Sequence, residues 1–169
     1  MGLEGVEIID NFLPEEEFRQ IQSIFLGQEI PWFWTDGVVL ADDEYAQLVH
    51  MIYFHGGVSE YLDAVSPLLQ KIDPLSLIRV KANLLPRERE ITVHGYHTDL
   101  QDGTREGVVT TAVFYLNTNN GYTIFEDGTK VSSVENRFVM FPHEMMHSGT
   151  SCTDSDRRVV LNFNFIKNS

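Results

Sequence analysis

Two short segments carry residues with the spacing of metal sites. Residues 143–147 read His-Glu-Met-Met-His. On a helix, this H-E-x-x-H pattern places two histidines on one face and a glutamate beside them, as in zinc peptidases. Residues 97–99 read His-Thr-Asp. With one distant histidine, that pair makes up the two-histidine, one-carboxylate ligand set of non-haem Fe(II) sites. The backbone around each segment decides between them.

The segment at 143–147 lies in a context that disfavours a helix. The preceding residues, RFVMFP (137–142), are typical of a strand that ends at proline, and the following SGTSCT (148–153) is rich in helix breakers and β-branched residues. A helix between them would have about one turn, which is marginal. No glutamate follows Glu144, and position 153 is threonine rather than histidine. Only Asp154 and Asp156 could complete a zinc site, so the peptidase is the weaker interpretation.

The segment at 97–99 fits a strand. Residues two apart on a strand point to the same side, so His97 and Asp99 would converge on one point while His94 faces away. Two later histidines compete to be the third ligand. In an extended segment their four-residue separation spans ~13 Å, so both cannot bind one metal. We favour His147, which begins a predicted strand, over His143, which falls in a turn.

The last predicted strand has two distinct faces. Val159, Leu161, Phe163 and Phe165 alternate with Arg158, Val160, Asn162 and Asn164. The apolar face should pack on a helical layer, and the other should look into the interior of a barrel. A buried arginine there needs an anionic partner, and its planar fork suits a carboxylate. A structural Asp or Glu is one such partner and a ligand is another. Arg157 has the opposite parity and is expected to be solvent-exposed, although the choice between the two arginines stays open.

The remaining elements predict a mainly β fold with N-terminal helices. Residues 14–27 and 58–72 have helical patterns, the second with a kink near Pro67, and VEIID (6–10) is a short strand candidate. After residue 75, eight short β-rich runs are separated by turn signals that include Asn120-Gly121 and Asp127-Gly128. We expect a single domain over 1–169, with a helical part at about 1–75 and an antiparallel jelly-roll core at about 76–167.

Composition limits the partners. Twelve basic and 25 acidic residues give a net charge of −13, which disfavours nucleic-acid binding. No apolar run approaches the ~18 residues of a membrane span, and no signal peptide is visible. Cys152 is the one cysteine, so no internal disulfide can form. We expect a cytoplasmic protein without membrane association, and the sequence does not predict an oligomeric state.

Several motifs together resemble the 2-oxoglutarate- and Fe(II)-dependent dioxygenases, in particular the small prolyl-hydroxylase-like branch of phage and bacteria. They are YHTD (96–99), FYLN (114–117), FPHEMMHSG (141–149), RRVVLNFNF (157–165) and the opening VEIIDNFLPEEEFRQI (6–21). The resemblance implies a double-stranded β-helix, a cupin-like form of jelly roll. It also implies Fe(II) bound by His97, Asp99 and His147, 2-oxoglutarate held by Arg158, and O2 as oxidant.

The implied activity is hydroxylation of a peptidyl or small-molecule substrate with release of succinate and CO2. Further candidates for the 2-oxoglutarate pocket are Asn83, Tyr115, Thr123 and Asn162. The chain departs from the family where Val160 replaces a frequent Ser or Thr, and where Arg158 replaces the lysine of close prolyl hydroxylases. GYTIF (121–125) also lacks the first Gly and the Glu of the family's GGETxF pattern. The alternatives are a non-catalytic jelly-roll binding module and, less favoured, a zinc metallopeptidase that uses HEMMH.

Overall fold

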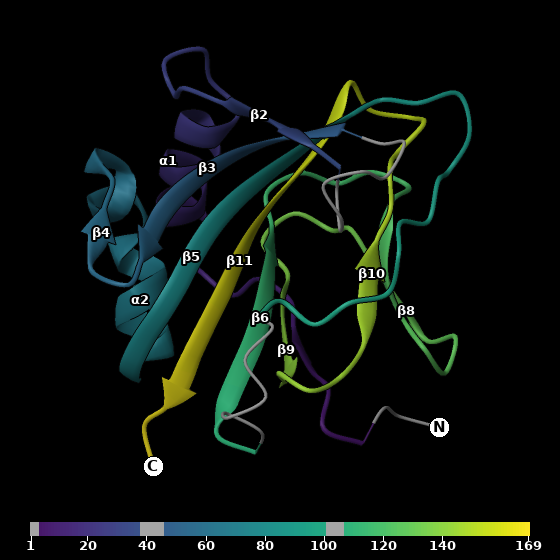
Figure 1. The fold of residues 1–169 in the computed structure, drawn as a ribbon. Helices are drawn as coiled ribbons and strands as arrows, with labels where there is room; N and C mark the ends of the chain where they lie inside the picture. The colour runs from purple at the N-terminus through teal and green to yellow at the C-terminus, as the bar shows by residue number, and fades with distance from the viewer. Residues whose placement is uncertain (1–3, 38–45, 101–106) are drawn as a thin grey trace.

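The computed structural model describes residues 4–37, 46–100 and 107–169 (Figure 1). Two antiparallel sheets dominate it, and short helices lie on the outer side of the larger one. The elements in chain order are β1 (Glu7–Ile9), α1 (Glu15–Phe25), β2 (Phe33–Asp36), β3 (Ala46–Phe54), β4 (Gly57–Val58), the 3-10 helix η1 (Glu60–Val65), α2 (Ser66–Ile72), β5 (Pro74–Pro86), β6 (Val109–Tyr115), β7 (Tyr122–Phe125), β8 (Lys130–Ser132), β9 (Phe138–Pro142), β10 (His147–Gly149) and β11 (Arg157–Lys167).

The two sheets differ in size. The larger has the strand order β1-β9-β6-β11-β5-β3-β2, with β4 paired to β3, and the smaller has the order β10-β7-β8. The long strands β5 and β11 form the centre of the larger sheet, and their register pairs Arg158 with Leu85 and Asn164 with Arg79. Paired residues of antiparallel strands point to the same face. The small sheet lies opposite this face (Figure 1), so the space between the sheets receives side chains from both.

The helical layer packs as the alternating pattern of the last strand predicted. Helix α1 begins after Pro14, has three glutamates in its first turn, and buries Phe18, Ile21 and Phe25. These side chains join one apolar core with the odd-numbered apolar residues of β11 from Val159 to Phe165. Burying each large apolar side chain contributes roughly 1.5–3 kcal/mol. This core therefore fixes which face of β11 is turned towards the small sheet.

The strands depart from the predicted ones in three places. Strands β2 and β3, which the sequence analysis did not predict, extend the large sheet beyond β5. The segment around 97–99 was expected to lie on a strand, but the backbone there forms only isolated bridges, at Val93 and His97. Asn120-Gly121 is not a hairpin turn, because β6 and β7 belong to different sheets, whereas Asp127-Gly128 does connect the paired strands β7 and β8. None of the described helices is both long and apolar enough to cross a membrane.

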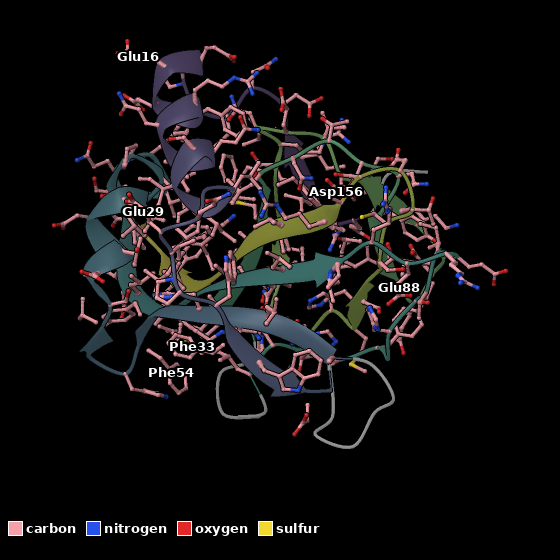
Figure 2. The ribbon with its side chains drawn as sticks, turned by 90° about the horizontal axis from the view of Figure 1, so that it is seen from above. Glu16, Glu29, Phe33, Phe54, Glu88 and Asp156 are labelled. Carbon is pink, nitrogen blue, oxygen red and sulfur yellow. The ribbon has the colours of Figure 1, made fainter. Side chains whose placement is uncertain are left out.

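The outer surface is rich in acidic groups. Figure 2 shows Glu16, Glu29, Glu88 and Asp156 projecting from the periphery of the molecule. The chain carries 25 acidic against 12 basic residues. The chain therefore carries a large excess of negative charge, whereas the interior cavity described below is lined by more cationic than anionic side chains.

Candidate functional site

The H-E-x-x-H segment is not helical. Residues 143–146 form a turn and bend between β9 and β10. The backbone N–H of His143 donates to the Val109 carbonyl at 3.0 Å, and that of Met145 donates to the Pro142 carbonyl at 3.0 Å. The shared helix face that a zinc peptidase requires is absent here, so the segment does not form that site.

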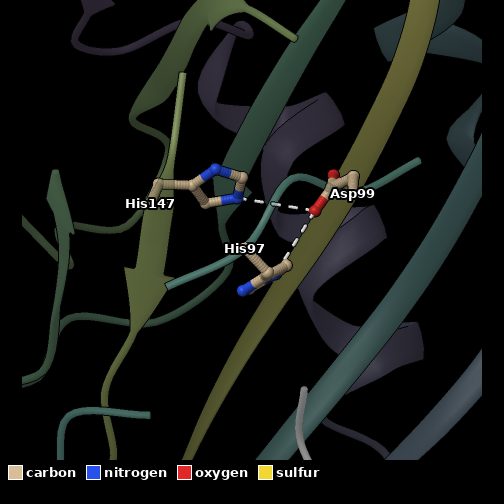
Figure 3. A group of neighbouring side chains, drawn as sticks. All are labelled: His97, Asp99 and His147. Carbon is tan, nitrogen blue, oxygen red and sulfur yellow. Dashed lines mark ion pairs between the residues drawn. The ribbon is translucent and has the colours of Figure 1, made fainter. Parts of the chain in front are cut away.

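The other three predicted metal ligands converge. One ligand atom from each of His97, Asp99 and His147 lies within 4.8 Å of the other two, and Figure 3 shows the three side chains around a common point. The Asp99 Oδ1 atom is 3.6 Å from His97 Nε2 and 3.4 Å from His147 Nε2. His147 and Asp99 are almost fully buried, and the side chain of His97 is 28% exposed. His147, rather than His143, completes the cluster.

The backbone orients both imidazoles. His97 Nδ1 is 3.1 Å from the Gly95 carbonyl, and His147 Nδ1 is 3.1 Å from the Met145 carbonyl. A carbonyl oxygen only accepts hydrogen bonds, so each Nδ1 donates, and in the neutral form of each imidazole the Nε2 atom carries the lone pair. An antiparallel bridge joins His97 and His147 through both backbone N–H groups. In the neutral form both Nε2 atoms could act as metal ligands.

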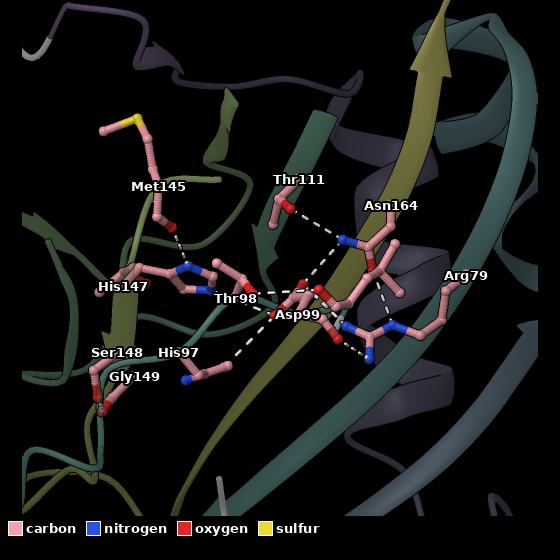
Figure 4. A network of polar contacts seen from close by, with 12 residues as sticks. Arg79, His97, Thr98, Asp99, Thr111, Met145, His147, Ser148, Gly149 and Asn164 are labelled. Carbon is pink, nitrogen blue, oxygen red and sulfur yellow. Dashed lines mark hydrogen bonds and ion pairs between the residues drawn. The ribbon is translucent and has the colours of Figure 1, made fainter. Parts of the chain in front are cut away.

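Asp99 is held by a network that the sequence analysis did not predict (Figure 4). Arg79 Nη2 lies 3.0 Å from Asp99 Oδ2. Asn164 Nδ2 donates to the same Oδ2 at 3.1 Å and to Thr111 Oγ1 at 3.0 Å. Arg79 Nε in turn donates to Asn164 Oδ1 at 2.9 Å. One carboxylate oxygen is therefore tied to the large sheet, while the other faces the two histidines.

The same contacts set the charge states of the cluster. Burial acts to raise the pKa of Asp99, but Arg79 and the two histidines outweigh it, so that pKa lies well below its ordinary 3.8. Burial acts to lower the pKa of His147, but the hydrogen bond and charge of Asp99 outweigh it and raise that pKa above 6.5. Asp99 is thus a carboxylate at neutral pH and is available as an anionic ligand.

Arg158 is the second charged feature of the interior. Its side chain is buried, with Nε donating to Ser133 Oγ at 2.9 Å and Nη2 lying 3.5 Å from Thr123 Oγ1. No Asp or Glu among the described residues forms an ion pair with it. Burial lowers the pKa of Arg158. A buried guanidinium without a carboxylate partner is costly and favours an incoming anion.

Arg157 points elsewhere. Its Nη2 donates to the carbonyl of Leu26 at the end of α1, so it is a partly buried structural contact on the helix side rather than the exposed residue we expected. Successive residues of β11 point to opposite faces of the sheet, so of these two arginines only Arg158 reaches the interior.

The four further pocket candidates lie around Arg158. Thr123, Asn83 and Asn162 line the interior cavity with it. Tyr115 lies behind them: its hydroxyl is 2.7 Å from Thr123 Oγ1, and its ring centroid is 5.7 Å from the Arg158 guanidinium carbon. The Oδ1 atoms of Asn83 and Asn162 are buried and accept no hydrogen bond within the described chain. Unsatisfied buried acceptors of this kind indicate a site for a polar ligand.

One cavity of about 560 Å³ joins these groups. The metal-ligand cluster lies on its wall together with Arg158, and side chains of β5 and β11 face side chains of β7 and β10 across it. Residues that sequence reasoning missed also line it: Arg79, Lys81 and Gln47. Arg79, Lys81 and Asn83 alternate with Val80 and Ala82 of the apolar core. That alternation was a signal from which the two additional cations could have been found.

Comparison with known proteins identifies the class of this fold. No protein-family model and no curated protein sequence matches the chain. Solved structures do match over nearly all of it, and they include members of the 2OG-Fe(II) oxygenase family and prolyl hydroxylases. The chain therefore has the fold of these oxygenases, and the resemblance seen in the sequence is confirmed at the level of structure.

Three of these structures show the extent of the likeness. An oxidoreductase of the 2OG-Fe(II) oxygenase family from Burkholderia pseudomallei has a TM-score of 0.69 at 12% identity, covering 98% of this chain and 87% of that one. A Trichoplax adhaerens prolyl hydroxylase bound to a hypoxia inducible factor peptide has a TM-score of 0.66 at 16% identity, covering 96% and 84%. A Pseudomonas putida prolyl-4-hydroxylase has a TM-score of 0.62 at 19% identity, covering 97% and 93%.

Proposed function

We propose that the chain is an Fe(II)- and 2-oxoglutarate-dependent dioxygenase that hydroxylates a peptidyl or small-molecule substrate. One observation carries the proposal. A two-histidine, one-carboxylate cluster and a buried arginine without a carboxylate partner line the same cavity. That combination occurs here in a chain with the fold of such oxygenases. On this proposal residues 1–169 form a single domain, with a helical part at about 1–75 and a double-stranded β-helix core at about 76–167.

The donor set fits Fe(II). Two neutral imidazoles and one carboxylate form the facial triad typical of non-haem Fe(II), which leaves open positions for other ligands. The proposal assigns His97, Asp99 and His147 as these ligands. Arg79 and Asn164 occupy Asp99 Oδ2, so Oδ1 is the oxygen that would be free to bind the metal. Hydrogen-bonded neighbours of this kind orient metal ligands and tune them.

The far end of the cavity fits the distal carboxylate of 2-oxoglutarate. Arg158 would bind that carboxylate, and the Thr123 hydroxyl, itself placed by Tyr115, lies within reach of the same group. Asn83 and Asn162 present polar groups along the wall between the arginine and the metal ligands. Bound there, Fe(II), 2-oxoglutarate and O2 supply the oxidising chemistry, with succinate and CO2 released. The chain's own part is to orient these groups and to exclude water.

The class of substrate is also part of the proposal. The Trichoplax adhaerens structure is a prolyl hydroxylase in complex with a peptide, which supports a peptidyl substrate. A cavity of about 560 Å³ is also compatible with a small molecule. The charge of the chain disfavours nucleic acid.

The first test is optical. Metal-free protein is mixed with Fe(II) in the absence of oxygen, and 2-oxoglutarate is titrated in. The expected result is a weak visible charge-transfer band that saturates at one equivalent per chain. Asp99→Ala should abolish it by removing iron binding. Arg158→Gln should leave iron bound while raising the Kd for 2-oxoglutarate roughly 30-fold, which corresponds to the loss of about 2 kcal/mol when a buried charge pair is broken.

Arg157→Gln is the matched control, because the neighbouring arginine contacts α1 rather than the cavity. It should bind 2-oxoglutarate like the unaltered protein. If iron binds without the band, and no succinate forms when oxygen is admitted, the chain is a binding module with the oxygenase fold rather than an enzyme. If Arg158→Gln binds 2-oxoglutarate normally, the role of that arginine is refuted.

A further inference from the structure

The cavity contains more positive charge than the proposed chemistry uses. Arg79, Lys81 and Arg158 are the cations among its described lining residues, and Asp99 is the one carboxylate. The proposed function assigns Arg158 to 2-oxoglutarate, and Arg79 is paired with Asp99. Lys81 is the cation that remains. In a chain with a net charge of −13, a cavity cation that forms no ion pair among the described residues points to a negatively charged ligand.

Lys81 belongs to the wall of the site by its register. It pairs with Asn162 of β11 on one side and with Met51 of β3 on the other. Its neighbours on the opposite face, Val80 and Ala82, are fully buried in the core beneath the helices. The side chain is therefore directed to the cavity face, two residues along the strand from Arg79.

Asp99 is not available as the partner of Lys81. Asp99 Oδ2 already accepts from Arg79 and Asn164, while Oδ1 faces the two histidines. No ion pair within the described ranges involves Lys81. Burial, followed by the nearby charge of Arg79, lowers the pKa of Lys81 to about 8, and the charge of Asp99 opposes this only in part. An ammonium group in these surroundings gains from an anion placed beside it.

Lys81 and Arg158 mark separate positions in the cavity. Arg158 pairs with Leu85, four residues from Lys81 on the same strand, and four residues of extended strand span about 13 Å. Lys81 thus lies near the metal-ligand end of the cavity, whereas Arg158 lies at the other. The keto-acid end of a co-substrate would have its charge compensated by the divalent ion, so it does not need Lys81.

Exposed apolar side chains lie near Lys81, on the same face of the large sheet and on the cavity wall. Met51, its direct cross-strand neighbour, is 41% exposed. Phe33 of the edge strand β2 is 59% exposed and pairs with Val49 on this same face. Tyr96, 40% exposed, lies on the cavity wall. Exposed apolar groups next to an isolated cation suit a ligand that is apolar over its body and carries one acid group.

We propose that the prime substrate of this site is an apolar carboxylic acid whose carboxylate binds Lys81 while its apolar body lies against Met51, Phe33 and Tyr96. The inference rests on the proposed function for the location of the chemistry, and it adds the chemical class of the substrate. The carboxylate is either that of a free acid or that of a glutamate side chain in a peptide.

The test compares acids with their own amides. Protein loaded with Fe(II) and saturated with 2-oxoglutarate is titrated by calorimetry without oxygen. The probe pairs are phenylacetate and phenylacetamide, hexanoate and hexanamide, and acetyl-glutamate amide and acetyl-glutamine amide. The third pair distinguishes a peptidyl acid from a free one. At least one acid should bind about tenfold more tightly than its amide, as expected for a hydrogen bond to a charged group.

Variants then locate the preference. Lys81→Met should reduce it to less than about twofold, and Lys81→Arg should retain it. Lys130→Met is the matched control, because Lys130 is exposed on β8 and lies over the Tyr122 ring. The Kd for 2-oxoglutarate, read from the charge-transfer band, should stay within about threefold in Lys81→Met, since Arg158 holds that ligand.

Three results would overturn the inference. The first is that no acid binds better than its amide in the unaltered protein, including the case in which neither binds. The second is that Lys81→Met keeps the preference. The third is that Lys81→Met weakens 2-oxoglutarate tenfold or more, which would make Lys81 part of the co-substrate site. Failure of the proposed function would appear separately, because the unaltered protein would then show no charge-transfer band.

Discussion

Replacing Arg79 by methionine tests how the charge of Asp99 is balanced. The two side chains form a buried ion pair, with 10% and 2% of their side-chain surfaces exposed. Arg79→Met removes the guanidinium and leaves Asp99 buried. Breaking a buried pair in this way typically costs about 3–5 kcal/mol. For a domain of this size each kcal/mol shifts the Tm by about 2–4 °C, so the metal-free variant should unfold roughly 6–20 °C below the unaltered protein.

Metal binding should recover part of this loss. A divalent ion beside Asp99 compensates the carboxylate, and Arg79 no longer repels the ion. Even at the dielectric constant of water, two unit charges 4 Å apart interact by about 1 kcal/mol. We therefore expect added Mn(II) to stabilise Arg79→Met by at least ~1 kcal/mol more than it stabilises the unaltered protein. Urea unfolding followed by circular dichroism, with EDTA and with Mn(II), measures both quantities.

Arg137→Met is the control for loss of an arginine. Arg137 pairs with Asp10, and their side chains are 19% and 55% exposed. An ion pair with a half-exposed partner is weaker than a fully buried one, so this variant should lose less stability than Arg79→Met and should show no added dependence on metal. The reasoning is refuted if metal-free Arg79→Met is as stable as the unaltered protein. It is also refuted if Mn(II) stabilises the variant less, since Arg79 would then chiefly orient Asp99 for the metal.

Two further predictions concern pH and a close contact. Because the pKa of His147 is raised above 6.5, its stabilisation is present below pH 6.5 and is lost as the pH rises through that raised value. The urea midpoint of metal-free protein should therefore fall as the pH rises above 6.5. Asp99→Asn should remove that decline. A decline that persists in the variant would show that the His147–Asp99 pair is not its cause. A Cβ on Gly121 would lie 2.7 Å from Arg158 Cδ and 2.8 Å from both Asn119 Oδ1 and the Ser151 carbonyl oxygen, whereas one on Gly149 would lie 3.4 Å from Arg158 Nη1. Gly121→Ala should therefore weaken 2-oxoglutarate binding several-fold in the optical titration, with Gly149→Ala as the milder control, and equal effects would count against a displaced arginine.

The sequence predicted the three clustered residues from local spacing. His97 and Asp99 were expected to converge because residues two apart on a strand share a face. They do converge, but the backbone there forms an isolated bridge and a bend instead of a strand. His147 was preferred to His143 from its place at a strand start, and β10 does begin there. Reasoning from short-range geometry succeeded because the bridge between His97 and His147 still presents both imidazoles to one side.

The support of Asp99 was not predictable in the same way. Asn164 is 65 residues from Asp99 in the chain, and Arg79 is 85 residues from Asn164. Which side chains meet depends on the register of β5 against β11, and no local pattern encodes that register. Strands β2 and β3 were missed for a similar reason. They lie in the part of the chain expected to be helical, and their pairing to β5 is a long-range contact.

The two central strands fix the layout of the whole site. Along the cavity face of β11 and its partner β5, successive pairs are Arg158 with Leu85, Val160 with Asn83, Asn162 with Lys81, and Asn164 with Arg79. The anion-binding end and the support of Asp99 are thus six residues apart on one strand, about 20 Å if fully extended. A register shift by one residue would turn every one of these polar groups into the helical core. The apolar residues on the other face of β11, packed under α1, are therefore also what keeps the arginine and the metal-ligand cluster at opposite ends of one cavity.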